Sequence, residues 1–176
     1  MATQQQTASG SVGQDFVEDF VARWLAAWNS HQAEQVLGMM GEDVVYDDSA
    51  WPRTMHGHAD VREFLAHSWR AFPDMRFELA DGPFLHPSEP RAAFHWRGDA
   101  THLGPIDPPG LAPTGKKLGF QGADFHEYSD GKLARLRIVF DVAHSMRQLG
   151  ALPPPGSPGE RLSTRLVNLQ NRLRRK

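Results

Sequence analysis

The chain has no cysteine among its 176 residues, which excludes disulfides, thiolate nucleophiles, iron–sulfur clusters and cysteine-based zinc sites. Residues 1–14 are polar and do not have the pattern of a signal peptide. No apolar run approaches the ~20 residues that span a bilayer. We therefore expect a cytoplasmic protein that has no membrane partner.

The patterns of metal and nucleotide sites are also missing. Nine histidines are present, but His56 and His58 fall in a predicted turn, and no pair has the helical spacing beside a glutamate that binds zinc. No glycine-rich phosphate loop follows a predicted strand. We expect neither a metal ion nor a cofactor.

Charge is distributed unevenly along the chain. The net charge is −2, but residues 160–176 carry six basic residues and one acidic residue, so the rest of the chain is acidic. This basic segment has no aromatic residue that could stack on a base. A nucleic-acid partner is therefore not expected.

Three segments have the apolar spacing of helices. Residues 16–29 form one broad apolar stripe, and residues 32–40 follow as a short second helix. Residues 59–72 repeat the spacing until Pro73 ends it.

Strands dominate the rest of the chain. Residues 42–48 predict a short strand, and β-type runs follow one another from Met75 onward. Asp130-Gly131 favours a hairpin between the last two runs, and residues 102–115 form a Gly- and Pro-rich loop at the rim. The predicted fold class is α+β: a curved antiparallel sheet that makes a cone, with the amino-terminal helices packed on its concave face.

The domain organisation follows from these elements. We expect a disordered tail over 1–14, the cone domain over 15–152, a Pro/Gly linker over 153–159, and a basic amphipathic helix over 160–176. The leucines of this helix recur at 4-3-4 spacing. Such a stripe is expected to pack on its own domain or on a partner subunit.

Three segments together resemble one family: AWNSHQAEQVLGMMGEDVVYDD, TMHGHADVREFL and GKLARLRIVFDVAHSMRQLG. In order and spacing they are similar to the SnoaL-like polyketide cyclases and ester cyclases, of the nuclear transport factor two fold. Ketosteroid isomerases and limonene epoxide hydrolases share this fold. The resemblance implies cofactor-free acid–base chemistry on a polyketide in an apolar pocket, and dimers are common in the fold.

The resemblance also implies two site residues. Asp141, in the run RIVFD, matches the acid/base aspartate at the end of the last strand, and His102, in THLG, matches a residue at the pocket mouth. The residues themselves allow another interpretation of Asp141, because an aspartate between a strand and a helix is a favoured N-cap.

The limonene epoxide hydrolases offer a second template. Arg97, Asp99 and Asp141 match their Arg-x-Asp pair and their strand-end aspartate. Tyr46 and Asp48 match their Tyr-x-Asn, with Asp where Asn is expected. The extra carboxylate would repel the catalytic pair unless it is protonated.

Strand alternation decides which of these residues can meet. Arg97 and Asp99 share the strand face opposite the aromatic residues, so they enter the pocket only if their face is the concave one. Asp124 and His126 share a face of the next strand, and Arg137 shares one with Asp141 on the last. Alternation could thus bring a His or an Arg beside Asp141.

Taken together, we expect a cyclase or isomerase acting on a small apolar oxygenated molecule, with Asp141 as general acid/base. The alternatives are an epoxide hydrolase that uses Asp99, Arg97 and Asp141, and a ligand-binding module without chemistry. A homodimer is expected. The catalytic candidates are Asp141, His102, Asp99 and Arg97, and the substrate-binding candidates are Tyr46, Asp48, Trp69, Asp124, His126 and Arg137.

Overall fold

The computed structural model of the chain describes residues 11–174. Residues 1–10 and 175–176 lie outside this range. Most of the tail expected over 1–14, and the last two residues of the basic segment, therefore fall outside the described residues.

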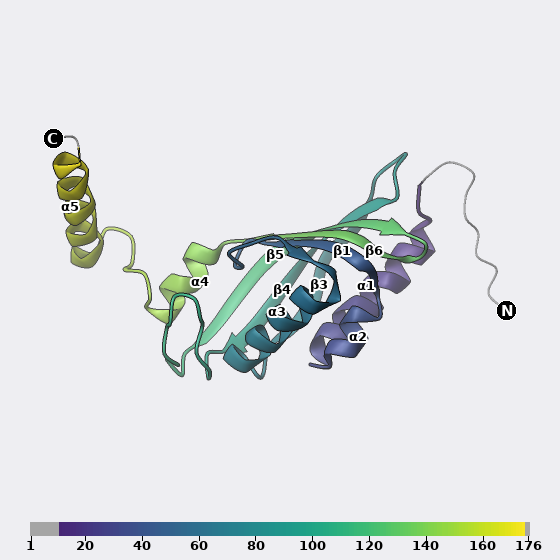
Figure 1. Cartoon of the computed structure of the whole chain (residues 1–176), viewed down its shortest axis with the longest axis horizontal. Helices are drawn as coiled ribbons and strands as arrows, with labels where there is room; N and C mark the ends of the chain where they lie inside the picture. The colour runs from purple at the N-terminus through teal and green to yellow at the C-terminus, as the bar shows by residue number, and fades with distance from the viewer. Residues whose placement is uncertain (1–10, 175–176) are drawn as a thin grey trace.

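A six-stranded curved sheet forms the centre of the α+β fold, in the order β2-β1-β6-β5-β4-β3 (Figure 1). Strands β3 to β6 form the predicted antiparallel meander, but β1 runs parallel to β6, so the sheet is not antiparallel throughout. Alternation of apolar residues indicates which side chains face the core and carries no information on the direction of a neighbouring strand. The strands are β1 (Met40–Asp48), β2 (Met55–His56), β3 (Arg76–Leu85), β4 (Arg91–Thr101), β5 (Lys117–Ser129) and β6 (Lys132–Phe140).

Irregularities of register accompany the curvature of the sheet. The pairing of β3 with β4 shifts between Leu79 and Phe84, and that of β5 with β6 shifts between Glu127 and Tyr128. Such bulges bend a strand and increase its twist. The hairpin predicted at Asp130-Gly131 is confirmed, because both residues have positive φ, 51° and 73°.

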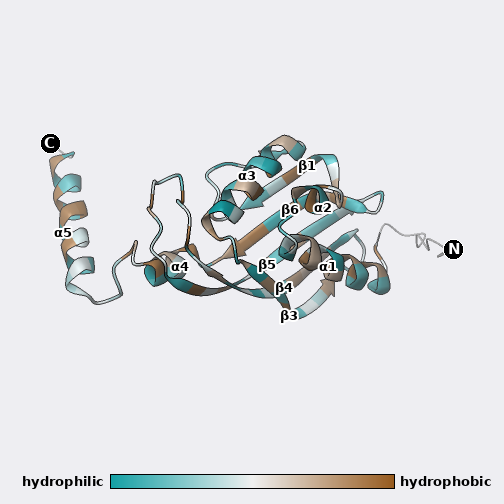
Figure 2. Ribbon diagram, turned by 90° about the horizontal axis from the view of Figure 1, so that it is seen from below, coloured by the Kyte–Doolittle hydropathy of each residue, from teal (hydrophilic) through white to brown (hydrophobic). Residues whose placement is uncertain are grey.

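Helices α1 (Gln14–Asn29), α2 (Ala33–Leu37) and α3 (Gly57–Ala71) cover the concave face (Figure 2). The apolar stripe of α1 is buried, as predicted; α1 contacts β3, and α3 contacts β1. The second helix is shorter than predicted, because Met40 pairs with Leu133 and so belongs to β1. A layer of helices over a curved sheet leaves the core, and the space for a site, between the two.

Two helices follow the sheet, α4 (Val142–Leu149) and α5 (Pro158–Leu173). Helix α5 stands away from the cone domain at the end of the linker (Figure 1), and none of its described residues is buried. The leucine stripe thus does not pack on its own domain; packing on a partner stays a prediction. Within residues 11–174, no helix is long and apolar enough to cross a membrane.

Candidate functional site

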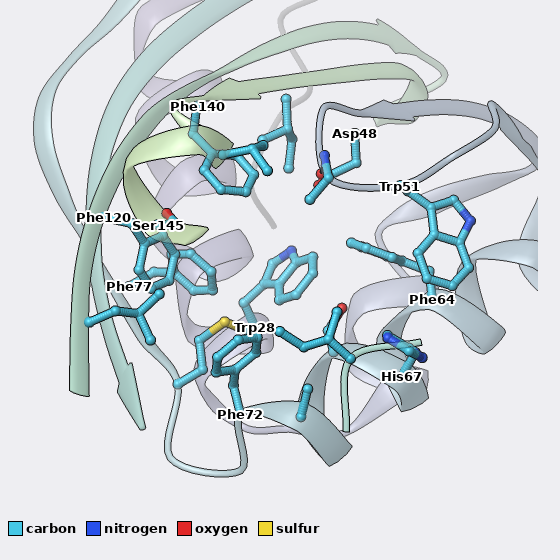
Figure 3. A pocket seen from close by; sticks show the side chains of 18 of the residues that line it. Trp28, Asp48, Trp51, Phe64, His67, Phe72, Phe77, Phe120, Phe140 and Ser145 are labelled. Carbon is cyan, nitrogen blue, oxygen red and sulfur yellow. Dashed lines mark hydrogen bonds between the residues drawn. The ribbon is translucent and has the colours of Figure 1, made fainter. Parts of the chain in front are cut away.

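A cavity of about 280 Å³ lies between the concave face of the sheet and the helices. Figure 3 shows its aromatic side chains arranged around a central space. Helix α4 and the connection between β4 and β5, residues 102–116, which we call the rim loop, contribute the rest of the wall. The aromatic lining comprises Trp24, Trp28, Trp51, Phe64, Phe72, Phe77, Trp96, Phe120 and Phe140.

Asp48 is an ionisable group on the cavity wall whose pKa is raised. It ends β1, on the same strand face as the buried Val44 and Tyr46, and its side chain lines the cavity (Figure 3). Burial raises the pKa of Asp48 from 3.8 to about 7, and the nearby charge of Asp124 adds to the rise. The N–H of Ala50, which donates to Oδ1 at 2.8 Å, opposes the shift.

Asp124 is a second carboxylate on the cavity wall, and it is only 2% exposed. Two indole groups hold it: Trp96 Nε1 donates to Oδ1 at 2.6 Å, and Trp24 Nε1 donates to Oδ2 at 3.1 Å. These bonds join β5 to β4 and α1, and they satisfy polar groups that would be costly to bury alone. The position of Asp124 is therefore fixed by packed rings.

His126 and Tyr46 lie beside these carboxylates without lining the cavity. Nε2 of His126 is 3.4 Å from Oδ2 of Asp124. The hydroxyl of Tyr46 has no partner of regular hydrogen-bonding geometry among the described residues, but it lies near enough to the Asp48 carboxylate to lower the pKa of Asp48. Burial raises the pKa of Tyr46 well above its usual value, and the charges of Asp48 and Asp124 raise it further. Both predicted residues thus stand next to the site.

The prediction that Asp141 lies deep in the pocket is wrong. Its exposed carboxylate caps α4, where Oδ1 accepts the backbone N–H of His144 at 2.8 Å. Ile138 and Phe140 of β6 face the cavity, so the alternating positions Val139 and Asp141 face outward. Arg137 and Asp141 do share one strand face, as alternation predicts, but this is the outer face of the sheet.

Arg97, Asp99 and Arg137 are likewise exposed on the outer face. Arg97 pairs with Glu78 at 3.2 Å, and such an exposed pair is worth ~0–1 kcal/mol. A second hollow brings Arg97, Asp99 and Asp141 together, but neither Asp48 nor Asp124 lines it. The arrangement expected of an epoxide hydrolase is therefore not formed in the cavity, nor does a His or Arg approach Asp141 from β5 or β6 as alternation had suggested.

His102 and Trp69 are placed behind the cavity wall instead of on it. The ring of His102 is fully buried beside Phe72, with centroids 5.4 Å apart, and its Nδ1 accepts the N–H of Thr114 at 3.2 Å. Burial lowers the pKa of His102. Trp69 stacks on His31 at 5.4 Å. Neither residue lines the space that a ligand would fill.

The rim loop closes one side of the cavity through Ile106, Pro108 and Pro109. Its backbone is tied to α3: the N–H groups of Leu103 and Gly104 donate to the carbonyl of Ala71 at 3.0 and 3.1 Å. The N–H of Asp107 donates to Nε2 of His67 at 3.3 Å. Burial, and then the charge of Arg70, lower the pKa of this partly buried histidine. The loop therefore lies where the sequence predicts it, at the rim, and forms one wall of the cavity.

A family model described as the SnoaL-like domain matches residues 21–136, the part of the chain that contains the cavity's two carboxylates. The chain belongs to the SnoaL-like family. The resemblance stated from the sequence is therefore confirmed.

Solved structures show the same fold for this SnoaL-like chain. AclR from Streptomyces galilaeus, a candidate hydroxylase, superposes with a TM-score of 0.67 at 23% identity, over 80% of this chain and 100% of its own. A candidate SnoaL-like polyketide cyclase from Jannaschia sp. CCS1 gives 0.69 at 15% identity, over 86% and 100%. A protein of ketosteroid isomerase-like fold from Catenulispora acidiphila, bound to trimethylamine, gives 0.63 at 14%, over 80% and 98%. No curated protein matches the chain.

Three residues of this SnoaL-like site escaped the sequence reasoning: Trp24, Trp96 and His67. Both tryptophans were assigned to the apolar faces of their elements, which is correct. A buried indole N–H usually finds an acceptor, so a tryptophan facing the same core as a predicted concave-face aspartate was the available signal. For His67, one helical turn beyond the buried Phe64, no comparable signal exists.

Among residues 11–174, no group of three or more His, Asp and Glu side chains could hold a metal ion.

Proposed function

We propose that the cavity is the active site of a cofactor-independent acid–base enzyme that cyclises or isomerises a small, neutral, oxygenated compound of the polyketide type. One observation carries the proposal: the carboxyl group of Asp48 lines an aromatic cavity and has a pKa of about 7. A general acid or base is most effective when its pKa lies near the operating pH.

Asp48 and Asp124 divide the work in this mechanism. Ionised Asp48 takes a proton from a carbon beside a carbonyl group, and the electron pair of the broken C–H bond moves into an enolate. In a cyclisation the enolate carbon attacks a second carbonyl carbon of the same molecule, the C=O π pair moves to that oxygen, and protonated Asp48 gives the oxygen its proton. In an isomerisation protonated Asp48 gives its proton to another carbon of the extended enolate, which forms the new C–H bond and restores the carbonyl group. Burial keeps the proton affinity of Asp48 high, and Asp124, held by Trp24 and Trp96, is a fixed charge that raises it further.

The lining of the cavity supports a neutral substrate. Two carboxylates face the space, and no Lys or Arg among the described residues lines it. An anionic ligand would be repelled without compensation. The volume of about 280 Å³ is close to the lower end of the ~300–1,000 Å³ range of small-molecule sites. The names of two structural neighbours, candidate polyketide cyclases, support polyketide-type substrates.

The proposal is tested by proton exchange on 2-tetralone, a neutral aromatic ketone. NMR follows the loss of its α-proton signals in deuterated buffer at neutral pH. We expect the protein to accelerate exchange, and the Asp48→Asn variant to lose roughly 100-fold or more of the acceleration. Asn keeps the size of the side chain and removes the proton-accepting carboxylate.

Asp141→Asn is the matched control, because Asn also caps helices and the residue lies outside the cavity. It should exchange at the wild-type rate. If exchange stays at the wild-type rate in Asp48→Asn, Asp48 is not the base. If 2-tetralone binds to the wild-type protein and is never exchanged, the cavity is a binding module without this chemistry.

A further inference from the structure

A histidine lies entirely inside an aromatic shell behind the cavity. His126, only 1% exposed, is surrounded edge-to-face by the rings of Phe20, Trp24, Phe94 and Tyr128, whose centroids are 5.1–5.9 Å away. An apolar ring would fill this place without desolvation cost, whereas an imidazole must find partners for its nitrogens. The polar ring therefore calls for an explanation beyond packing.

Both nitrogens of His126 have a buried partner. Nδ1 is 3.0 Å from the hydroxyl of Tyr128, and Nε2 is 3.4 Å from Oδ2 of Asp124. A neutral imidazole has one donor and one acceptor nitrogen, and a carboxylate can only accept. If Nε2 donates to Asp124, then Nδ1 accepts the Tyr128 O–H. Burial raises the pKa of Tyr128, so its proton is retained.

Strand alternation produces this chain of contacts. Asp124, His126 and Tyr128 occupy successive concave-face positions of β5, and all three are buried. In the tautomer that carries its proton on Nε2, His126 gives the carboxylate a third N–H group beside the indoles of Trp24 and Trp96. Three donors from three elements leave Asp124 one orientation toward the cavity.

We propose that Tyr128 and His126 are positioning residues: the Asp124 carboxylate, which can only accept, selects the imidazole tautomer that donates Nε2–H, the Tyr128 hydroxyl donates to Nδ1 and holds the ring in place, and the Nε2–H bond fixes Asp124 at the cavity wall. The consequence for activity rests on the proposed function, because it acts through the effect of Asp124 on Asp48. The other titratable groups that sense Asp124 are Tyr46 and Asp48 of β1.

The tautomer can be measured without any turnover. Long-range ¹⁵N–¹H correlation spectra of the ¹⁵N-histidine-labelled full chain distinguish Nε2–H from Nδ1–H imidazoles, and His126→Gln assigns the signal. We expect the Nε2–H pattern at pH 7. Tyr128→Phe removes one oxygen and keeps the ring contacts; it should keep the Nε2–H pattern, because the carboxylate can still only accept, and it should shift the Nδ1 resonance, because Nδ1 loses its hydrogen-bond donor. Phe16→Leu, which removes a ring contact of Tyr128 but no hydrogen bond, should leave this resonance unchanged.

An Nδ1–H or doubly protonated His126 in the wild-type protein would contradict the proposed relay, the chain of hydrogen bonds from Tyr128 through His126 to Asp124. So would an unchanged Nδ1 resonance in Tyr128→Phe. Because these spectra need no substrate, they decide the relay even if 2-tetralone exchange is absent, which would count against the proposed function alone.

The kinetics of 2-tetralone exchange test the same positioning role in a second way. His126→Phe fills the shell without a donor, so kcat for exchange should fall about tenfold or more, while KM changes little. The pH midpoint of the rate should also move down, because the charge that raises the proton affinity of Asp48 is less well fixed. His126→Gln restores an N–H donor and should recover part of kcat. Equal losses in Gln and Phe variants, with an unmoved midpoint, would show that only packing matters.

Discussion

Asp48 and Asp141 are both aspartates at the end of a strand, and their surroundings give them opposite properties. Asp141 faces solvent and caps α4. Asp48 faces an aromatic cavity and a second carboxylate, and its pKa rises to about 7. The residue type is the same, so the strand face on which each lies determines which of them can exchange protons near neutrality.

The raised pKa of Asp48 makes folding stability depend on pH. The folded state binds this proton up to pH of about 7, whereas the ordinary pKa is 3.8. The stabilising contribution is therefore complete below pH ~4 and is lost as the pH rises to about 7, a change of up to about 4 kcal/mol. We expect Asp48→Asn to match the wild-type protein near pH 4 and to exceed its free energy of unfolding at pH 8.

Urea denaturation from pH 4 to pH 8 measures this difference. Asp141→Asn serves as the control and should follow the wild-type pH dependence. Parallel curves for the wild-type protein and Asp48→Asn would contradict the burial of an ionisable Asp48.

The sequence predicted which side chains share a strand face more reliably than whether that face points into the cavity or into solvent. The shared face of Asp124 and His126 follows from alternation alone, and the structure confirms it. Which face is concave depends on where the helices dock, so the sequence left the side of Arg97 open and placed Asp141 in the pocket wrongly. The pKa of Asp48 depends on residues distant in the chain, and no local pattern encodes it.

The rim loop is the element that closes the cavity, and its fit to α3 depends on one glycine. A Cβ on Gly104 would lie 2.0 Å from the carbonyl oxygen of Arg70 and 2.8 Å from its carbon, both backbone atoms that cannot move independently. The close approach allows the N–H groups of Leu103 and Gly104 to reach Ala71.

Gly104→Ala should therefore push the loop away from α3. We expect a loss of about 1–3 kcal/mol of unfolding free energy, as for other overpacked sites. The amides of residues 103 and 104 should exchange faster with deuterium. Gly119→Ala is the control, because a Cβ there meets nothing within 4 Å. Unchanged amide protection in Gly104→Ala would show that the loop is not anchored at this point.

Elements with a strong local signal were the most predictable. Pro73 limits α3 through the restriction on the preceding residue, and Asp130-Gly131 sets the last hairpin. The parallel pairing of β1 with β6 was not predictable, because it joins residues some 90 positions apart, such as Tyr46 and Leu136. Only the assembled sheet makes that contact.

At the scale of the molecule, the chain consists of a cone domain and a projecting helix. Helix α5 begins with Ser157 Oγ accepting the N–H of Glu160 at 3.2 Å, and it carries leucines that are 54–66% exposed. Because no described residue of α5 is buried, its packing contributes little to the stability of the domain.

Removing residues 158–176 should therefore leave the melting temperature within roughly 2 °C of the full chain, since exposed residues usually contribute within ±0.5 kcal/mol. Differential scanning calorimetry measures this, and far-UV circular dichroism should show the loss of helix. A fall of more than ~5 °C would mean that the leucine stripe is covered in solution, by the domain or by a second copy.

Four of the five tryptophans, Trp24, Trp28, Trp51 and Trp96, stand around the cavity. Most of the protein's ultraviolet emission therefore originates within contact distance of any molecule that enters. Two of these fluorophores are also bonded to Asp124, so a ligand that disturbs the carboxylate changes their emission as well. Tryptophan fluorescence should therefore report whether a ligand occupies the cavity, and compound collections can be screened by this signal without an enzymatic assay.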